Sequence, residues 1–158
     1  MLRVVFDTNV YISALITPGG AAEKAYLSAI NGNITLFTSI SILTETAIKL
    51  REKFLWEDDR ITTAIRHIGS AAHVLKPVIK LKILKDDPDN RILECAKEAK
   101  ADLVVTGDRH LLQLKKFDTI KIVTIREFLD ILKNRKIEGR FPYFQNPRIR
   151  KTNCPDGL

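Results

Sequence analysis

Four acidic side chains lie where the sequence predicts a single reactive site. Asp7 comes directly after a buried apolar run, and Asp108 follows another apolar run after two intervening residues. Asp89 stands at the start of a predicted helix, and Glu45 lies in a predicted helix that follows a third apolar run. Ligands in an open parallel sheet bind beyond the carboxyl ends of the strands. We therefore expect these four carboxylates to meet at one edge of a sheet.

A bound divalent cation would explain why carboxylates gather there. Like charges that come close repel one another and raise one another's pKa, so the convergence needs a compensating positive charge. Mg²⁺ prefers octahedral oxygen ligands and is typically held by one or two carboxylates together with substrate phosphate. In that position it can activate water and stabilise the charge that develops on a phosphodiester. Thr8, Asn9 and Thr106 stand beside the acids and are suited to orienting carboxylates and water.

Each acid also has an ordinary explanation. Asp89 can be a first-turn acid that the helix dipole favours, and Glu45 can be an exposed helix residue. The stretch 106–108 can be a simple turn after a strand. The stretch 7–9 is the hardest to explain in this way, because three polar groups directly after a buried strand need partners. The interpretation as a metal site therefore depends on the four acids taken together.

Apolar periodicity predicts the elements that must position these acids. We expect short buried strands at 2–6, 34–37, 103–105 and 120–123. We expect one helix at 21–30, a second that begins with a cap at Ser39 or Ser41, and two more at 58–71 and 89–100. A last helix should follow a capping box at 124–127 and continue through 132. Uniformly apolar strands that alternate with helices predict an α/β fold whose mostly parallel sheet is covered on both faces.

Length and composition indicate one globular domain. The chain has 158 residues, of which 45% are apolar and 28% charged, and this argues against general disorder. It shows no apolar run near the ~20 residues of a membrane helix and no signal-peptide pattern, so we expect a cytoplasmic protein without membrane contact. Cys95 and Cys154 lack metal-ligand spacing, and a disulfide framework is not expected.

The distribution of charge separates the end of the chain from the rest. The net charge is +7, which favours polyanionic partners, although a solvated lysine-rich surface explains it about equally well. We predict a domain over 1–133 and an irregular, basic, aromatic-containing tail over 134–158. The tail aromatics Phe141, Tyr143 and Phe144 can either stack on bases or hold the tail against the core.

The four acidic stretches together resemble the PIN-domain family. They are Val-Val-Phe-Asp-Thr-Asn-Val at the start, Glu45 in its helix, Asp-Pro-Asp-Asn followed by Ile-Leu and Ala, and Leu-Val-Val-Thr-Gly-Asp. The stretch 123–129 resembles the family's closing strand and helix, so the resemblance covers 2–132 in unbroken order. It is greatest to the VapC-like ribonucleases, the toxin components of prokaryotic toxin–antitoxin pairs.

The resemblance implies a three-layer α/β/α sandwich with a central, mostly parallel sheet and an acidic pocket that binds Mg²⁺ or Mn²⁺. It assigns the catalytic and metal-binding roles to Asp7, Glu45, Asp89 and Asp108. It assigns supporting roles to Thr8, Asn9 and Thr106. We select Asp89 as the third acid because the apolar positions after it then match the buried face of the family's helix; Asp87 is the next choice, and Asp86 follows.

The resemblance also implies an activity and partners. Proteins of this kind are endoribonucleases, often homodimers, that an antitoxin protein inhibits. The expected mechanism is in-line attack of a metal-activated water on an RNA phosphodiester, which leaves a 5′-phosphate on the downstream product. Lys49, Arg91 and Arg109 stand near the acids in the sequence and are expected to contact the RNA backbone.

Other functions remain open at this point. A haloacid-dehalogenase-like phosphatase also begins with a strand that ends in Asp, but it usually has a second Asp where this chain has Asn9, which cannot act as a general acid. A non-catalytic PIN-fold module that binds RNA or protein is a second alternative, and processing of stable RNA is a third. The three histidines lack zinc-ligand spacing and are expected to be surface or core residues, although His110 is near Asp108.

Overall fold

The computed structural model describes residues 1–140, and the side chains of residues 1–136. The strands are β1 (Arg3–Phe6), β2 (Thr35–Ser39), β3 (His73–Leu75), β4 (Leu103–Val105), β5 (Lys116–Phe117) and β6 (Ile120–Val123). The helices are α1 (Thr8–Ile16), α2 (Ala21–Ile30), α3 (Ile40–Glu52), α4 (Asp58–Ala71), α5 (Asp87–Glu98), α6 (Arg109–Leu114) and α7 (Ile125–Arg140).

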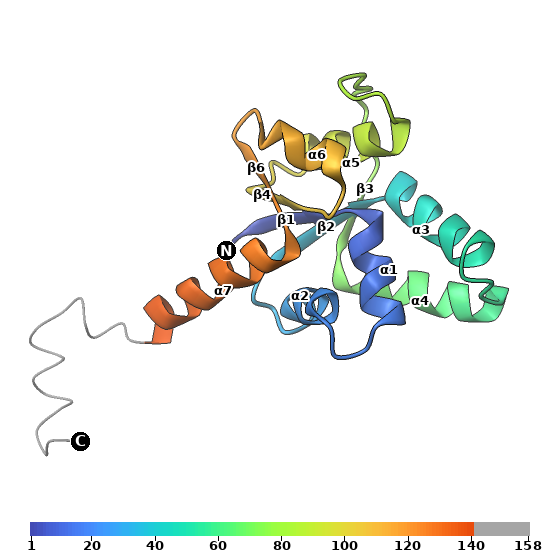
Figure 1. Ribbon diagram of the computed structural model, residues 1–158, viewed down its shortest axis with the longest axis horizontal. Helices are drawn as coiled ribbons and strands as arrows, with labels where there is room; N and C mark the ends of the chain where they lie inside the picture. Colours follow the sequence, from blue (N-terminus) through green and yellow to red (C-terminus); the bar gives the residue numbers. More distant parts are fainter. Residues whose placement is uncertain (141–158) are drawn as a thin grey trace, which may run out of the picture.

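The strands form one sheet in the order β3-β2-β1-β4-β6-β5. The pairs from β3 to β6 are parallel, and β5 joins β6 in the antiparallel sense. Figure 1 shows α5 and α6 on one side of this sheet and α1, α2 and α7 on the other. The predicted α/β fold with a mostly parallel, covered sheet is therefore confirmed.

The central position of β1 creates the place where a site can form. β1 lies between β2 and β4, so the chain leaves it in one direction to build β2 and β3 and later returns on the other side to build β4 and β6. In open α/β sheets a crevice forms beyond the carboxyl ends of the strands at such a reversal. Asp7 follows β1 and Thr106 follows β4, so both stand at this crevice.

Burial on both faces explains why the strands are uniformly apolar. Val4, Val5 and Phe6 of β1 are 0% exposed. The ring of Phe6 meets the rings of Tyr11 and Phe128 with 5.7 Å between centroids in each case, so it joins α1 and α7 to the sheet. Burial of each such side chain contributes about 1.5–3 kcal/mol to the free energy of folding.

Side-chain caps begin several of the helices. Ser39 Oγ accepts a hydrogen bond from Ile42 N at 3.2 Å, so Ser39 is the cap of α3. Thr124 and Glu127 form the predicted capping box: Thr124 Oγ1 accepts from Glu127 N at 3.1 Å, and Glu127 Oε1 accepts from Thr124 N at 3.2 Å. These bonds satisfy backbone N–H groups that have no partner within their helices.

Several elements differ from the sequence-based expectation. Helix α1 forms over Thr8–Ile16, where the sequence predicted no element. Its apolar residues follow one another almost without a break from Val10 to Ile16, so they leave no amphipathic pattern. Helix α5 begins at Asp87, with Pro88 in its first turn, where proline is well tolerated. The short elements β3, β5 and α6 were also not predicted.

The irregular structure predicted from residue 134 onward is wrong for its first part. Helix α7 continues beyond Leu132 to Arg140, because residues 133–138 are mostly good helix formers and contain no proline or glycine. The aromatic positions predicted for the tail, and Cys154, lie outside the described residues. Within the described part of the chain, no helix is long and apolar enough to cross a membrane.

Candidate metal centre

Asp7 and Thr106 meet at the carboxyl ends of β1 and β4. The backbone N–H of Asp7 donates to the carbonyl of Val105 at 2.9 Å, which continues the strand pairing by one residue. Thr106 Oγ1 then donates to Asp7 Oδ2 at 2.7 Å and accepts from the backbone N–H of Asp108 at 2.9 Å. One buried hydroxyl therefore holds the Asp7 carboxylate and the backbone that presents Asp108.

The Asp7 carboxyl is buried, with 6% of the residue exposed. Burial raises its pKa, and the nearby negative charge of Asp108 raises it further. The hydrogen bond from Thr106, the charge of Lys49 and the backbone N–H of Thr8 lower it, but the net shift is upward. A cation at this carboxylate would relieve the unfavourable charge.

Asp108 caps the short helix α6. Its Oδ1 accepts hydrogen bonds from the backbone N–H of His110 at 2.8 Å and of Leu111 at 3.1 Å. The side chain is 28% exposed. Asp108 therefore has a structural role as a helix cap, where a simple turn was the ordinary interpretation, and this role also fixes the direction of its carboxylate.

Asp89 lies in the first turn of α5 and is 7% exposed. Its Oδ2 is buried and has no hydrogen-bond partner among residues 1–136. Burial raises the pKa of Asp89 to about 6, with further upward contributions from Asp108, Asp7 and Asp86 and an opposing one from His110. The charges of Asp7, Asp89 and Asp108 therefore interact, although the three residues come from distant stretches of the chain.

This donor set fits a divalent cation. A buried carboxylate oxygen without a partner is energetically costly, and native proteins normally satisfy such an atom. Carboxylate oxygens from Asp7, Asp89 and Asp108 are the ligand type that Mg²⁺ and Mn²⁺ accept. The unpartnered Asp89 Oδ2 is the atom that such a cation would satisfy.

Glu45 lies at the rim and not among the three interacting aspartates. Its side chain is 30% exposed, and its Oε1 is 3.7 Å from Lys49 Nζ. Glu45 lines a small hollow of about 170 Å³. The hollow is lined by Thr8, Ser41, Ile42, Glu45, Asp87, Pro88 and Arg91. Asp87 thus shares the hollow of Glu45, whereas Asp89 is buried beside Asp7 and Asp108.

The supporting and basic residues differ in how exposed they are and in whether they are already paired. Thr8 is buried, whereas Asn9 is exposed and accepts a hydrogen bond from Lys49 Nζ at 3.4 Å. Arg91 forms an ion pair with the buried Glu94, in which its Nε lies 3.1 Å from Glu94 Oε1. Arg109 is exposed directly beside Asp108. Arg109 is therefore the most exposed of the three basic residues, whereas Lys49 and Arg91 are each paired with a glutamate and have side chains 22% and 24% exposed.

Two buried polar residues that the sequence did not single out hold the chain that enters α5. Asn90 Oδ1 accepts from the backbone N–H of Ile83 at 3.1 Å and of Leu84 at 2.8 Å, and its Nδ2 donates to the carbonyl of Leu84 at 2.8 Å. Glu94 Oε2 accepts from the backbone N–H of Leu81 at 2.7 Å. A polar residue on the otherwise apolar face of the helix is the signal that could have indicated this role.

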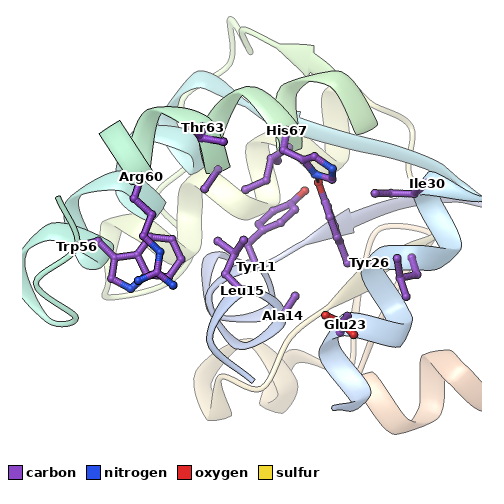
Figure 2. Close-up of a pocket in the computed structure, with 13 residues that line it drawn as sticks. Tyr11, Ala14, Leu15, Glu23, Tyr26, Ile30, Trp56, Arg60, Thr63 and His67 are labelled. Carbon is purple, nitrogen blue, oxygen red and sulfur yellow. Dashed lines mark hydrogen bonds between the residues drawn. The ribbon is translucent and has the colours of Figure 1, made fainter. Parts of the chain in front are cut away.

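Another hollow lies elsewhere, among α1, α2 and α4. It has a volume of about 700 Å³, and its lining is mostly apolar. Figure 2 shows Tyr26 and His67 in contact at one end, where the Tyr26 hydroxyl lies 2.6 Å from His67 Nδ1. At the other end the Arg60 guanidinium lies over the Trp56 ring, 3.6 Å from its centroid. The predicted site residues do not line this hollow.

The fold and the acidic edge together define a class of protein: α/β proteins whose open sheet carries carboxylates at the carboxyl ends of its central strands, where the strand order reverses. The model of the PIN domain family matches residues 3–110, which is more than half of the chain. The chain therefore belongs to the PIN domain family, as the resemblance of its motifs predicted.

Two further similarities extend this finding. An uncharacterized protein of Methanocaldococcus jannaschii is 33% identical over 141 residues, which cover 82% of this chain and 90% of that protein. The crystal structure of VapBC2 from Rickettsia felis, bound to a DNA fragment from their promoter, contains a chain of similar fold. The TM-score is 0.57 at 15% identity, over 78% of this chain and 98% of that chain. At this identity the similarity concerns the fold.

Proposed function

We propose that this protein is a divalent-cation-dependent endoribonuclease that hydrolyses RNA phosphodiester bonds at the acidic edge of its sheet. The observation that supports this proposal most strongly is the convergence of the buried Asp7 and Asp89 with the partly exposed Asp108, with Asp89 Oδ2 unpartnered in the described part of the chain. Repulsion among three interacting carboxylates destabilises the folded state unless a positive charge lies between them. Membership of the PIN domain family supports the same interpretation.

The proposed catalytic and metal-binding acids are Asp7, Glu45, Asp89 and Asp108. A bound Mg²⁺ or Mn²⁺ ion would lower the pKa of a water molecule and stabilise the charge that develops on the phosphodiester. Thr106 orients Asp7 through its hydroxyl, and the α6 cap orients Asp108. Glu45 extends the site from its rim, across the hollow that Thr8 also lines.

Positive charge beside the acids would hold the RNA backbone. Lys49 and Arg109 are the proposed phosphate contacts, because both lie at the rim. Arg91 is a weaker candidate, since its guanidinium is already paired with the buried Glu94. The net charge of +7 favours association with a polyanion and makes the binding sensitive to salt.

We further propose that the protein is the toxin of a toxin–antitoxin pair, acting in the cytoplasm as a homodimer that a partner antitoxin inhibits. The fold similarity to a chain of the Rickettsia felis VapBC2 complex supports this biological role. Processing of a stable RNA uses the same chemistry, and the identity of the RNA target distinguishes the two roles.

The test is a substrate panel for the full chain with Mn²⁺, Mg²⁺ or EDTA. The substrates are a mixed-sequence single-stranded RNA, DNA of the same sequence, and p-nitrophenyl phosphate. We expect cleavage of RNA with Mn²⁺ or Mg²⁺ and none with EDTA. Hydrolysis of p-nitrophenyl phosphate without RNA cleavage would favour the phosphatase alternative. Binding of RNA without any cleavage, on a panel that includes structured RNAs, would favour the non-catalytic module.

A further inference from the structure

A histidine and two aspartates form a second group of potential metal ligands, which shares Asp89 with the three interacting aspartates. Asp86, Asp89 and His110 each offer one ligand atom, and these atoms lie within 4.8 Å of one another. His110 Nδ1 is 3.6 Å from Asp86 Oδ2 and 3.9 Å from Asp108 Oδ1. The group joins the start of α5 to the start of α6, two segments that β4 separates in the sequence.

Asp86 does not make the hydrogen bond that its position would normally provide. It is the N-cap residue of α5, where an aspartate side chain usually accepts from a backbone N–H of the first turn. Here the side chain makes no cap hydrogen bond, and it lies beside the imidazole of His110 instead. The carboxylate is thus left available for another ligand.

Asp89 supplies the independent sign of a ligand. It is 7% exposed, and its Oδ2 lacks a hydrogen-bond partner within the described residues. The side chains of Asp86 and His110 are 57% and 64% exposed. The group therefore has one buried wall and an outer side open to solvent, which allows an ion to enter.

We propose that Asp86, Asp89 and His110 bind a divalent transition-metal ion, adjacent to the ion of the proposed nuclease site and sharing Asp89 with it. An imidazole nitrogen suits first-row transition metals, whereas Mg²⁺ strongly prefers oxygen ligands. This position therefore selects a metal such as Co²⁺ or Mn²⁺ over Mg²⁺. The inference rests on the proposed function only through the shared Asp89.

Two binding measurements on the full chain test the proposal without an activity assay. The first is calorimetric titration with Co²⁺ and, separately, with Mg²⁺. The second is pulsed electron paramagnetic resonance of the Mn²⁺-loaded protein, in which a coordinating imidazole produces a nitrogen signal. The variants are His110→Ala and Asp86→Asn, and both change exposed side chains, so the fold should tolerate them.

Matched controls come from the same residue types at other places. His73 is exposed on β3, where its ring stacks on Phe37 with 5.2 Å between centroids. Asp118 is exposed in the turn between β5 and β6, at the amino end of β6. This is the edge of the sheet opposite the carboxyl ends of β1 and β4, where the acids lie. His73→Ala and Asp118→Asn should bind Co²⁺ as wild type does. Unfolding curves for all variants check that each is folded.

The expected result is that His110→Ala and Asp86→Asn each weaken Co²⁺ binding by about tenfold or more, with Mg²⁺ binding much less affected. The nitrogen signal of Mn²⁺ should disappear in His110→Ala. Unchanged Co²⁺ affinity in both variants, or a nitrogen signal that persists in His110→Ala, would overturn the inference. Failure of the nuclease proposal looks different: RNA would remain uncut while Co²⁺ binding still depended on His110.

Discussion

The metal-free protein should become more stable when Asp89 is replaced by Asn. Its pKa is raised from 3.8 to about 6, so the folded protein ionises this carboxyl less readily than the unfolded chain does. At a pH between these two pKa values the folded state binds more protons than the unfolded state, so the stability of the protein falls as the pH rises. The loss is complete above the folded-state pKa, and Asn, which carries no charge, avoids it.

The structure allows the size of this effect to be worked out. Each unit of pKa shift corresponds to about 1.4 kcal/mol, which sets an upper value of about 3 kcal/mol for Asp89. The dipole of α5 opposes the effect because Asp89 is in the first turn, but it contributes only about 0.3–1 kcal/mol. We therefore expect a net gain of about 1–3 kcal/mol, or roughly 3–8 °C in melting temperature.

Thermal unfolding followed by circular dichroism in EDTA provides the assay. At about pH 8 Asp89→Asn should melt above wild type, and the difference should shrink at about pH 4.5. Asp118→Asn is the matched control, since its exposed carboxylate contributes little and asparagine tolerates its φ of 53°. Added Mn²⁺ should stabilise wild type more than Asp89→Asn. A variant that melts at or below wild type at the higher pH in EDTA would refute this account of the site.

Three other substitutions test the contacts that support the site. Thr106→Val removes the hydroxyl that donates to Asp7, and urea unfolding at neutral pH should show a loss of about 1–3 kcal/mol; an unchanged midpoint would contradict it. Asn90→Ala releases the backbone of 83–84, so amide hydrogen exchange there should accelerate, and protection equal to wild type would count against this anchoring role. Phe128→Ala empties a fully buried position and should lower stability by about 3–5 kcal/mol, whereas a loss under about 1 kcal/mol would mean that α7 does not pack as described.

The sheet was largely predictable because its signal is local. Val4, Val5 and their counterparts in the other central strands are buried on both faces, so each strand is a continuous apolar run that can be recognised without its neighbours. The capping box at Thr124 was predictable for the same reason, since both partners stand three residues apart. Helix α1 was not predictable from periodicity, because its residues from Val10 to Ile16 are apolar almost without a break and show no helical spacing.

The site depends more on long-range placement. That Asp7 and Thr106 would stand at one edge follows from parallel strands, whose carboxyl ends point the same way. The position of Glu45 at the rim depends on how α3 leaves the sheet, and no local pattern encodes that geometry. The proximity of Asp86 and His110 depends on two helix starts that β4 separates in the chain. From the sequence, His110 was therefore expected to be a surface or core residue near Asp108, and Asp86 was the last choice for the third acid.

Cleavage of single-stranded RNA by wild type, Asp7→Asn and Asp118→Asn, side by side with Mn²⁺, Mg²⁺ or EDTA, tests the central claim most directly. Asp7→Asn preserves the shape of the side chain and removes one carboxylate charge from the acidic edge, whereas Asp118→Asn makes the same change at the opposite edge. We predict metal-dependent cleavage by wild type and Asp118→Asn, and a loss of about a hundredfold or more in Asp7→Asn. Equal cleavage by all three proteins, or cleavage that persists in EDTA, would contradict the assignment of this edge as the catalytic site.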